Sequence, residues 1–251
     1  MCRHLAYLGP PTSLAGLLLD RPHSLVRQSW APADMRHGGT INADGFGVGW
    51  RADGDIVRYR RDTPMWTDAD FAGLAATVLT SAAVAAVRSA TVGMPVVETA
   101  CAPFTDGQWL FSHNGVVAGW PDSVAELAAE LPVADLLTLD APTDAALLWA
   151  LVRHRLRRGC PPAAAVSTVV SEVASAAPES RLNLLLSDGD TAVATSWGHA
   201  LSVWRDQDAV VIASEPWDDD PLWTEVPDRR LVVTTRQRTT VHRFADETEK
   251  P

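Results

Sequence analysis

MCRHLAYLG, residues 1–9, begins the chain with a cysteine directly after the first methionine and a mostly apolar run behind it. If the methionine is removed, Cys2 carries a free α-amine and a thiol on the same residue. An α-amine has a pKa of about 8 in model compounds, so it can accept the thiol proton without a histidine. We therefore take Cys2 as a candidate nucleophile with its own base. The competing interpretation is a small residue of the core.

The size and charge of the chain limit the kinds of protein it can be. With 251 residues, of which 47% are hydrophobic, we expect a single domain over 1–251 with a flexible tail at 245–251. A net charge of -10 argues against nucleic acid as a partner, because phosphate binding needs clustered cations. We see neither a long apolar run nor a signal peptide, so we expect no membrane span and a cytoplasmic location.

Metal ions and cofactors find little support in the sequence. Cys2, Cys101 and Cys160 are an odd number without paired spacing, which argues against a disulfide framework and a zinc ribbon. Cys2 and His4 would face the same side of a strand, but two ligands alone are a weak indication of a metal site. The glycines of 45–49 lack the following helix and the full spacing of a dinucleotide-binding loop. We expect no metal and no cofactor.

The order of the predicted elements favours an α+β fold. Strands fill the first part of the chain, helices the middle and strands the end, which predicts antiparallel sheets covered by helices rather than a doubly wound fold. Asp53-Gly54 and Asp188-Gly189 are predicted hairpin turns, and Asn114-Gly115 is predicted to end a strand in a tight turn. The predicted strands are 2–8, 45–51, 56–61, 82–88, 108–113, 182–187, 192–197, 201–205, 210–213, 231–235 and 241–244, and the predicted helices are 71–79, 125–131, 145–158 and 163–176.

Polar residues at the ends of these elements are candidates for substrate contacts. Arg88 follows a buried strand, where a guanidinium can grip a carboxylate with two hydrogen bonds; a surface ion pair is the alternative. The Asn114 amide and the Gly115 N–H can converge on a developing oxyanion, or they can form an ordinary turn. Asp144, at a predicted helix start, can hold an ammonium group or cap the helix.

Taken together, these pieces resemble class II glutamine amidotransferase domains, which are N-terminal-nucleophile hydrolases. The resemblance rests on Cys2, the R-x-A-T-x-G stretch at Arg88, the H-N-G at His113 and the acidic Asp144, and it covers nearly the whole chain. It implies a four-layer αββα sandwich of two antiparallel sheets covered by helices. Three further stretches are similar to the branch of the family that carries no synthetase domain: 42–50, 181–183 and 214–216.

The resemblance also implies the catalytic roles. Cys2 would attack the carbon of a γ-glutamyl amide while its α-amine relays the proton to the leaving nitrogen. A γ-glutamyl thioester would form, and water would then release glutamate. Asn114 and Gly115 would stabilise the oxyanion in both steps.

The substrate contacts follow from the same resemblance. Arg88 would hold the glutamyl α-carboxylate and Asp144 the α-ammonium. Thr91 and His113, which lie within the matching motifs, would also contact the substrate. The implied partner is a small γ-glutamyl compound, and a homo-oligomer remains open.

Two positions depart from the family pattern. Ser89 and Val92 stand where tryptophan and histidine are common, and a roomier, less polar surrounding suits a substituted γ-glutamyl amide better than free glutamine. We therefore expect a stand-alone hydrolase of such an amide. One alternative is a glutaminase subunit that supplies ammonia to a separate synthase. The other is a catalytically retired fold that only binds γ-glutamyl ligands or a protein partner.

The chain is also rich in tryptophan, with ten. Trp30, Trp66, Trp217 and Trp223 lie in predicted loops, where an indole face can receive a trimethylammonium group. The acidic run 218–220 would add to that attraction. A solvated loop is the simpler interpretation of this run.

Overall fold

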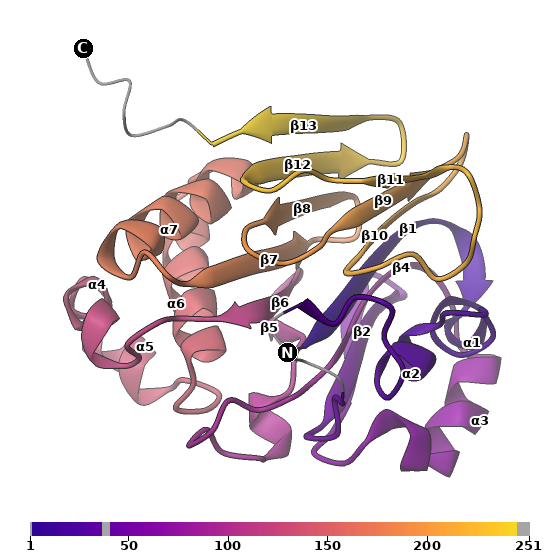
Figure 1. Ribbon diagram of the computed structural model, residues 1–251, viewed down its shortest axis with the longest axis horizontal. Coiled ribbons are helices and arrows are strands. Elements are labelled where there is room, and N and C mark those ends of the chain that lie inside the picture. The colour runs from indigo at the N-terminus through magenta and orange to yellow at the C-terminus, as the bar shows by residue number, and fades with distance from the viewer. Residues whose placement is uncertain (1, 37–40, 245–251) are drawn as a thin grey trace.

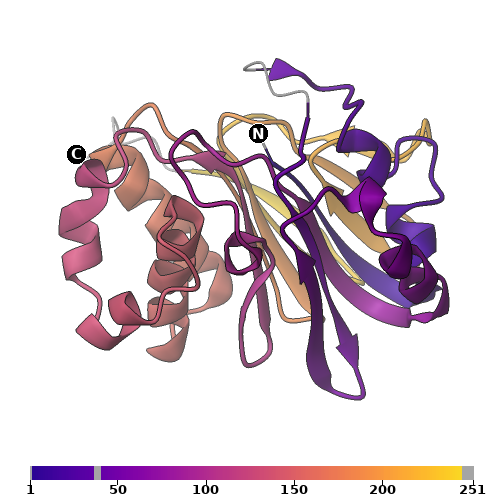
Figure 2. The same ribbon diagram turned by 90° about the horizontal axis from the view of Figure 1, so that it is seen from below.

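The computed structural model describes residues 2–36 and 41–244. Two antiparallel sheets lie against each other, and helices cover the outer face of each, as Figure 1 and Figure 2 show. The layers are clearest in Figure 2, where the sheets stand between a pink and orange group of helices and an indigo and purple group. The predicted α+β sandwich of four layers is confirmed. Met1 and the tail 245–251 lie outside the described residues.

The first sheet is built around the strand that follows Cys2. This strand, β1 (Arg3–Ser13), lies in the middle of the order β11-β9-β10-β1-β4-β2-β3 and pairs antiparallel with β4 and β10. Its side chains alternate between the helices and the second sheet, so both of its faces are buried. The other strands are β2 (Phe46–Ala52), β3 (Asp55–Arg61), β4 (Leu79–Val87), β9 (Ser202–Arg205), β10 (Val210–Ala213) and β11 (Trp223–Glu225).

The second sheet has the order β13-β12-β8-β7-β6-β5. Leu110 and Leu185 of this sheet pack against Ala6 and Leu8 of the first, and these contacts form part of the core between the sheets. The strands are β5 (Phe104–Asp106), β6 (Trp109–Val116), β7 (Arg181–Ser187), β8 (Thr191–Ser196), β12 (Arg230–Thr235) and β13 (Thr239–Arg243).

Each sheet has a separate helical cover with its own apolar core. Helices α6 and α7 pack on the second sheet through buried side chains such as Trp149 and Val169, and α1 and α3 pack on the first through Leu14 and Phe71. No helix within 2–36 and 41–244 combines the length and the apolar character that crossing a bilayer requires. The helices are α1 (Leu14–Leu18), α2 (Leu25–Gln28), α3 (Ala69–Thr77), α4 (Ala125–Ala129), α5 (Val133–Leu137), α6 (Asp144–Arg157) and α7 (Pro162–Ala176), with short 3-10 turns η2 (Met65–Thr67), η3 (Glu98–Ala100) and η4 (Asp122–Val124).

The main error of the sequence prediction lies at Asn114-Gly115. The predicted tight turn is wrong, because β6 continues to Val116 with Asn114 opposite Asn183 and Gly115 opposite Leu182. Pairing along the whole of β7 overrides the local turn preference of the dipeptide. The short elements α1, α2, α5, β5 and β11 were also not predicted, since each has too few residues to show a period.

The two predicted hairpin turns are confirmed. Asp53 and Gly54 have φ angles of 52° and 94°, which a tight two-residue turn between β2 and β3 requires. Gly189 has a φ of 89° between β7 and β8, and the Asp188 carboxylate accepts the Thr191 N–H at 2.7 Å. Both turns therefore set the register of the strands they join.

Glycines in β2 allow a close approach of the chain before β5. A Cβ on Gly47 would collide with the backbone oxygen of Ala102, and one on Gly49 would lie 2.5 Å from a Leu110 methyl group. The glycine at 47 therefore lets another stretch of backbone approach β2, and the glycine at 49 makes room for a side chain of the second sheet.

Replacing Gly47 by Ala should therefore destabilise the protein by about 1 to 3 kcal/mol, because the added methyl group meets backbone that cannot easily move. The control is Gly73→Ala in helix α3, where nothing lies within 4 Å of the new Cβ. That change should stabilise the helix by up to about 1 kcal/mol. Urea unfolding of both variants measures the two free energies. Equal effects of the two substitutions would contradict the close packing at Gly47.

Candidate active site

Strand pairing places Cys2 beside Arg88. Arg3 lies opposite Val87 in the pairing of β1 with β4, so the next residues along the two strands are Cys2 and Arg88. The Cys2 thiol lies 3.8 Å from the backbone oxygen of Ser89, and the residue is partly exposed. The thiol is therefore accessible at the end of the central strand.

A pocket opens at this point, with about 340 Å³ of empty space that is partly open to solvent. Its walls come from the end of β4, the end of β6 and the start of α6, three elements that are distant in the sequence. Six of the seven predicted site residues line it, namely Cys2, Arg88, Thr91, His113, Gly115 and Asp144.

Arg88 is buried without a carboxylate partner. Only 9% of the residue is exposed, and its Nη1 donates to the backbone oxygen of Asp44 at 3.4 Å. The Asp44 side chain is used elsewhere, because it accepts the Ala90 N–H at 2.8 Å. Within 2–36 and 41–244 no acidic side chain lies at ion-pair distance from the guanidinium. The alternative of a surface ion pair is wrong.

Asp144 is a buried carboxylate on the opposite wall. The N-cap of helix α6 is Thr143, whose hydroxyl accepts the Ala146 N–H at 3.2 Å, so Asp144 is the first residue of the helix and not its N-cap. Asp144 still accepts one N–H of the first turn, that of Ala145, at 2.8 Å. One oxygen of Asp144 accepts the Val117 N–H at 3.0 Å and thereby ties α6 to the end of β6. No basic side chain among the described residues forms an ion pair with it.

Gly115 leaves room for close contacts at the end of β6. A Cβ at this position would collide with the backbone oxygen of Arg181 and would lie 2.5 Å from Nε2 of His113. That nitrogen lies 3.0 Å from the same Arg181 oxygen, so the His113 ring is held against the neighbouring strand. Only glycine fits here, and the residue lines the pocket.

Asn114 is buried behind the pocket and does not line it. Alternation along β6 turns its side chain to the layer between the sheets, the side on which Cys2 lies by the alternation of β1. Its Nδ2 donates to the hydroxyl of Ser214 at 3.4 Å, while its Oδ1 is buried with no partner among the described residues. The Ser214 hydroxyl also accepts the His4 N–H at 3.0 Å and so links Asn114 to the strand of the nucleophile.

His4 is fully buried and neutral. Burial, followed by the nearby charges of His113 and Arg3, lowers its pKa from 6.5 to about 3. Its Nδ1 lies 3.3 Å from the Ser112 hydroxyl across the two sheets. In the described part of the chain no three His, Cys, Asp or Glu side chains are grouped to hold a metal ion. His4 is therefore a neutral polar link in the core.

Cys101, the second thiol near the site, is unsuited to nucleophilic attack. It is fully buried, and its Sγ donates to the backbone oxygen of Arg61 at 3.2 Å. Burial raises its pKa to about 11, so the thiol stays protonated at neutral pH. All three cysteines are free.

Two of the stretches that resemble the family have structural roles. The Asn183 amide accepts the Trp197 N–H at 2.7 Å and donates to two backbone oxygens of the following loop. Glu215 accepts the N–H groups of Ala33 and Asp34, the latter at 2.8 Å. Both residues fix loops around the site through backbone groups.

The four tryptophans of the predicted loops have different surroundings. Trp217 is buried with the Arg21 guanidinium 4.8 Å from its ring centre, so that face is already occupied. Trp30 and Trp66 form an exposed edge-to-face pair. Trp223 begins β11 instead of lying in a loop, and its Nε1 donates to Asp218 at 2.9 Å. The acidic run is thus partly structural, not merely a solvated loop.

Two further residues shape the site. Thr143, which stands with Asp144 at the predicted start of this helix, caps α6 and leaves Asp144 able to bond Val117. Ser214 holds the Asn114 amide, a role that was not predicted. Ser214 lies in one of the stretches that resemble the family, but its partner is in a distant strand.

His4 should make stability depend on pH. The pKa of His4 in the folded protein lies below its unfolded value of 6.5, so the unfolded chain binds more protons between pH 6.5 and about 3. The free energy of unfolding therefore decreases as the pH is lowered through this range. Between about pH 7 and about pH 4.5 the loss is about 2 to 3 kcal/mol. His4→Gln has no such proton. Urea unfolding should show the stability of the two proteins converging by this amount at the lower pH; an unchanged difference would contradict a neutral His4.

Comparison with known proteins agrees with the geometry. The model of the family described as class II glutamine amidotransferases matches residues 12–207. γ-Glutamyl-hercynylcysteine sulfoxide hydrolase of Mycolicibacterium smegmatis is 45% identical over 233 residues, 92% of this chain and 95% of the relative. The protein of the same name from Mycobacterium tuberculosis is 42% identical over 243 residues, 96% of each.

Solved structures show the same fold. A class II glutamine amidotransferase domain protein from Silicibacter pomeroyi superposes with a TM-score of 0.70 at 22% identity, over 98% of this chain and 100% of that one. The glutamine phosphoribosylpyrophosphate amidotransferase of B. subtilis gives a TM-score of 0.66 at 15% identity, over 97% of this chain and 49% of that one. The chain therefore belongs to the class II glutamine amidotransferases.

Proposed function

We propose that this chain hydrolyses the γ-glutamyl amide of γ-glutamyl-hercynylcysteine sulfoxide to glutamate and hercynylcysteine sulfoxide, a step of ergothioneine biosynthesis. The identity of 45% and 42% to two hydrolases of that name supports the substrate. The observation that carries the proposal is a pair of buried, opposite charges, Arg88 and Asp144, lining the pocket that Cys2 also lines.

These charges match the invariant end of the substrate. A γ-glutamyl group carries an α-carboxylate and an α-ammonium on one carbon. A buried charge without an ion-pair partner costs free energy, and a ligand that supplies the opposite charge recovers part of that cost. The carboxylate pairs with Arg88 and the ammonium with Asp144, while Thr91 and His113 bound the remaining space. This pair of contacts recognises the glutamyl group and makes no contact with the rest of the substrate.

Acylation of Cys2 is the first chemical step. The α-amine, free once Met1 is removed, accepts the thiol proton, and the sulfur adds to the γ-carbonyl carbon. The C–N bond then breaks, and the leaving amine takes the proton from the α-ammonium. The product is a γ-glutamyl thioester on Cys2. Met1 lies outside the described residues, so its removal stays part of the proposal.

Water completes the reaction. The α-amine removes a proton from a water molecule that attacks the thioester carbon, and the thiol leaves with that proton. Both steps pass through a tetrahedral oxyanion. The Gly115 N–H and the Asn114 amide are the donors assigned to it, and loss of one such donor costs about 100- to 1000-fold in rate in other enzymes. Ser214 holds the Asn114 amide in place through the bond at 3.4 Å.

A glutaminase that feeds a separate synthase is the second candidate. Glutamine carries the same α-carboxylate and α-ammonium, so Arg88 and Asp144 do not separate it from a substituted amide. Val92, which replaces the family's common histidine, is fully exposed, and the neighbouring pocket residues Ser89 and Ala90 are small. Small side chains leave space for a substituent on the amide nitrogen, and this favours the hydrolase.

The purified protein should release glutamate from γ-glutamyl-hercynylcysteine sulfoxide, and Cys2→Ala should abolish the release. Arg88→Lys should raise KM by about 10-fold or more, because an ammonium replaces a bidentate contact with a single one. A coupled glutamate assay measures both.

Free glutamine as a second substrate separates the two candidates. Faster turnover of glutamine than of the substituted amide would contradict the proposed substrate and identify the protein as a glutaminase. Release of glutamate by the Cys2→Ala variant at the wild-type rate would rule out the thioester route altogether.

A further inference from the structure

A second pocket lies next to the candidate active site, and none of the predicted site residues lines it. It has about 880 Å³ of empty space, much of it open to solvent. Its polar and aromatic lining comes from four segments that are distant in the sequence or in separate strands, namely Asp34 and Arg36, Ser202, Ser214 and Glu215, and Trp223 and Glu225.

Two contacts join this pocket to the nucleophile. The Arg3 guanidinium donates through Nη1 to the backbone oxygen of Cys2 at 3.4 Å and through Nη2 to the backbone oxygen of Asp34. On the other side, Ser214, whose hydroxyl holds Asn114, also lines the second pocket. The two pockets therefore lie within one side chain of each other, with Cys2 in the first.

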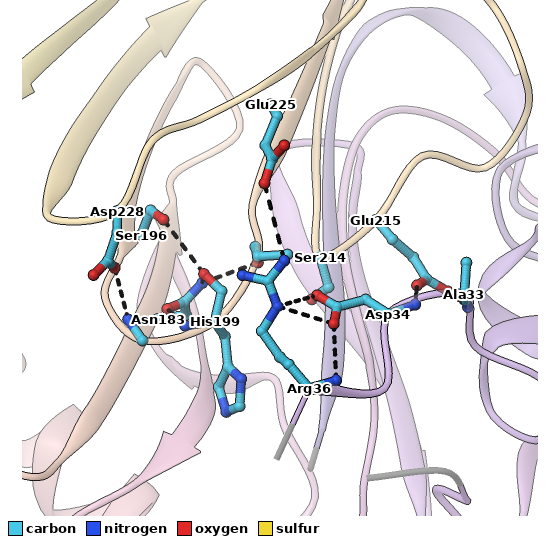
Figure 3. A network of polar contacts seen from close by, with 12 residues as sticks. Ala33, Asp34, Arg36, Asn183, Ser196, His199, Ser214, Glu215, Glu225 and Asp228 are labelled. Carbon is cyan, nitrogen blue, oxygen red and sulfur yellow. Dashed lines mark hydrogen bonds and ion pairs between the residues drawn. The ribbon is translucent and has the colours of Figure 1, made fainter. Parts of the chain in front are cut away.

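The second pocket carries more negative than positive charge. Asp34, Glu215 and Glu225 line it, whereas Arg36 is the only basic residue among its described lining. Figure 3 shows the Arg36 guanidinium between two of the carboxylates, with Nε 2.8 Å from Asp34 and Nη2 3.9 Å from Glu225. Arg3, just behind this lining, also interacts with the charges of Glu215 and Asp34. Glu225, 3.9 Å from Arg36 and largely exposed, is therefore the carboxylate most open to an added cation.

Trp223 adds a fixed aromatic wall. Its Nε1 is bonded to Asp218 at 2.9 Å and its ring packs edge-on against Trp217 at 5.8 Å, so the indole cannot turn freely. Of the four tryptophans considered from the sequence, Trp223 alone lines this pocket within the described residues. An indole beside carboxylates is a suitable surface for a quaternary ammonium.

We infer that the second pocket binds the leaving-group end of the substrate, a betaine with a trimethylammonium and an adjacent carboxylate; this inference rests on the proposed function. Trp223 and Glu225 face the trimethylammonium, and Arg36 binds the carboxylate in exchange for part of its contact with Glu225. The first pocket recognises the glutamyl group and the second recognises what the amide nitrogen carries. Specificity for the substituted amide over glutamine then comes from the second pocket.

Two substrates isolate this contact. γ-Glutamyl-hercynylcysteine sulfoxide carries the betaine, and γ-glutamyl-S-methylcysteine sulfoxide has the same scissile amide and sulfoxide without it. Trp223→Leu should raise KM for the first by about 5- to 30-fold and change kcat/KM for the second by less than about 2-fold. Glu225→Gln, at a side chain that is 73% exposed, should act in the same direction and more weakly. Trp66→Leu removes an exposed indole outside both pockets and is the matched control.

Binding of hercynine alone gives a readout that needs no turnover. Calorimetry with the Cys2→Ala protein should detect hercynine, and adding Trp223→Leu should weaken its affinity by a similar factor while Trp66→Leu leaves it unchanged. Equal affinity in all three proteins, no binding at all, or an equal loss on both substrates would overturn the inference. Hercynine binding by a protein that hydrolyses neither substrate would instead refute the proposed function and leave the pocket assignment standing.

Discussion

The antiparallel pairing of β1 with β4 is the contact on which the candidate site depends. It puts Arg3 opposite Val87 and so brings Cys2 and Arg88 together at the end of the central strands. Alternation fixes the direction as well, because Ala6 shares the face of Cys2 and packs between the sheets. A shift of one residue would turn the thiol to the helices, and the buried core on both faces of β1 opposes such a shift.

The second sheet and its helices supply the other half of the site. Asp144 bonds the Val117 N–H, which holds the start of α6 against the end of β6. The same end of β6 carries Gly115, where contact with the backbone of Arg181 excludes any side chain. Arg88 and Asp144 remain buried without ion-pair partners among the described residues, an arrangement that reduces stability and prepares the pocket for a ligand of opposite charges. The apolar layers on both sides compensate for this cost.

Much of the fold and part of the site followed from the sequence. The strand at 210–213 was predicted to the residue from a short apolar run that ends before Ser214, and six predicted site residues share a pocket. The turn predicted at Asn114-Gly115 was wrong because strand pairing with β7 outweighed the turn preference of the dipeptide. The second pocket could not be predicted from the sequence, because Asp34, Ser214 and Glu225 are brought together only by the fold and form no pattern along the chain. The hydrogen bond between Asn114 and Ser214 could not be predicted for the same reason.

Arg88 and Asp144 are proposed to hold the two charges of a γ-glutamyl group beside Cys2. A crystal structure of the Cys2→Ala protein with γ-glutamyl-hercynylcysteine sulfoxide tests it most directly. The α-carboxylate should lie on the Arg88 guanidinium, the α-ammonium on the Asp144 carboxylate and the amide carbon next to residue 2. A glutamyl group bound away from both charges, or with the amide turned away from residue 2, would contradict it.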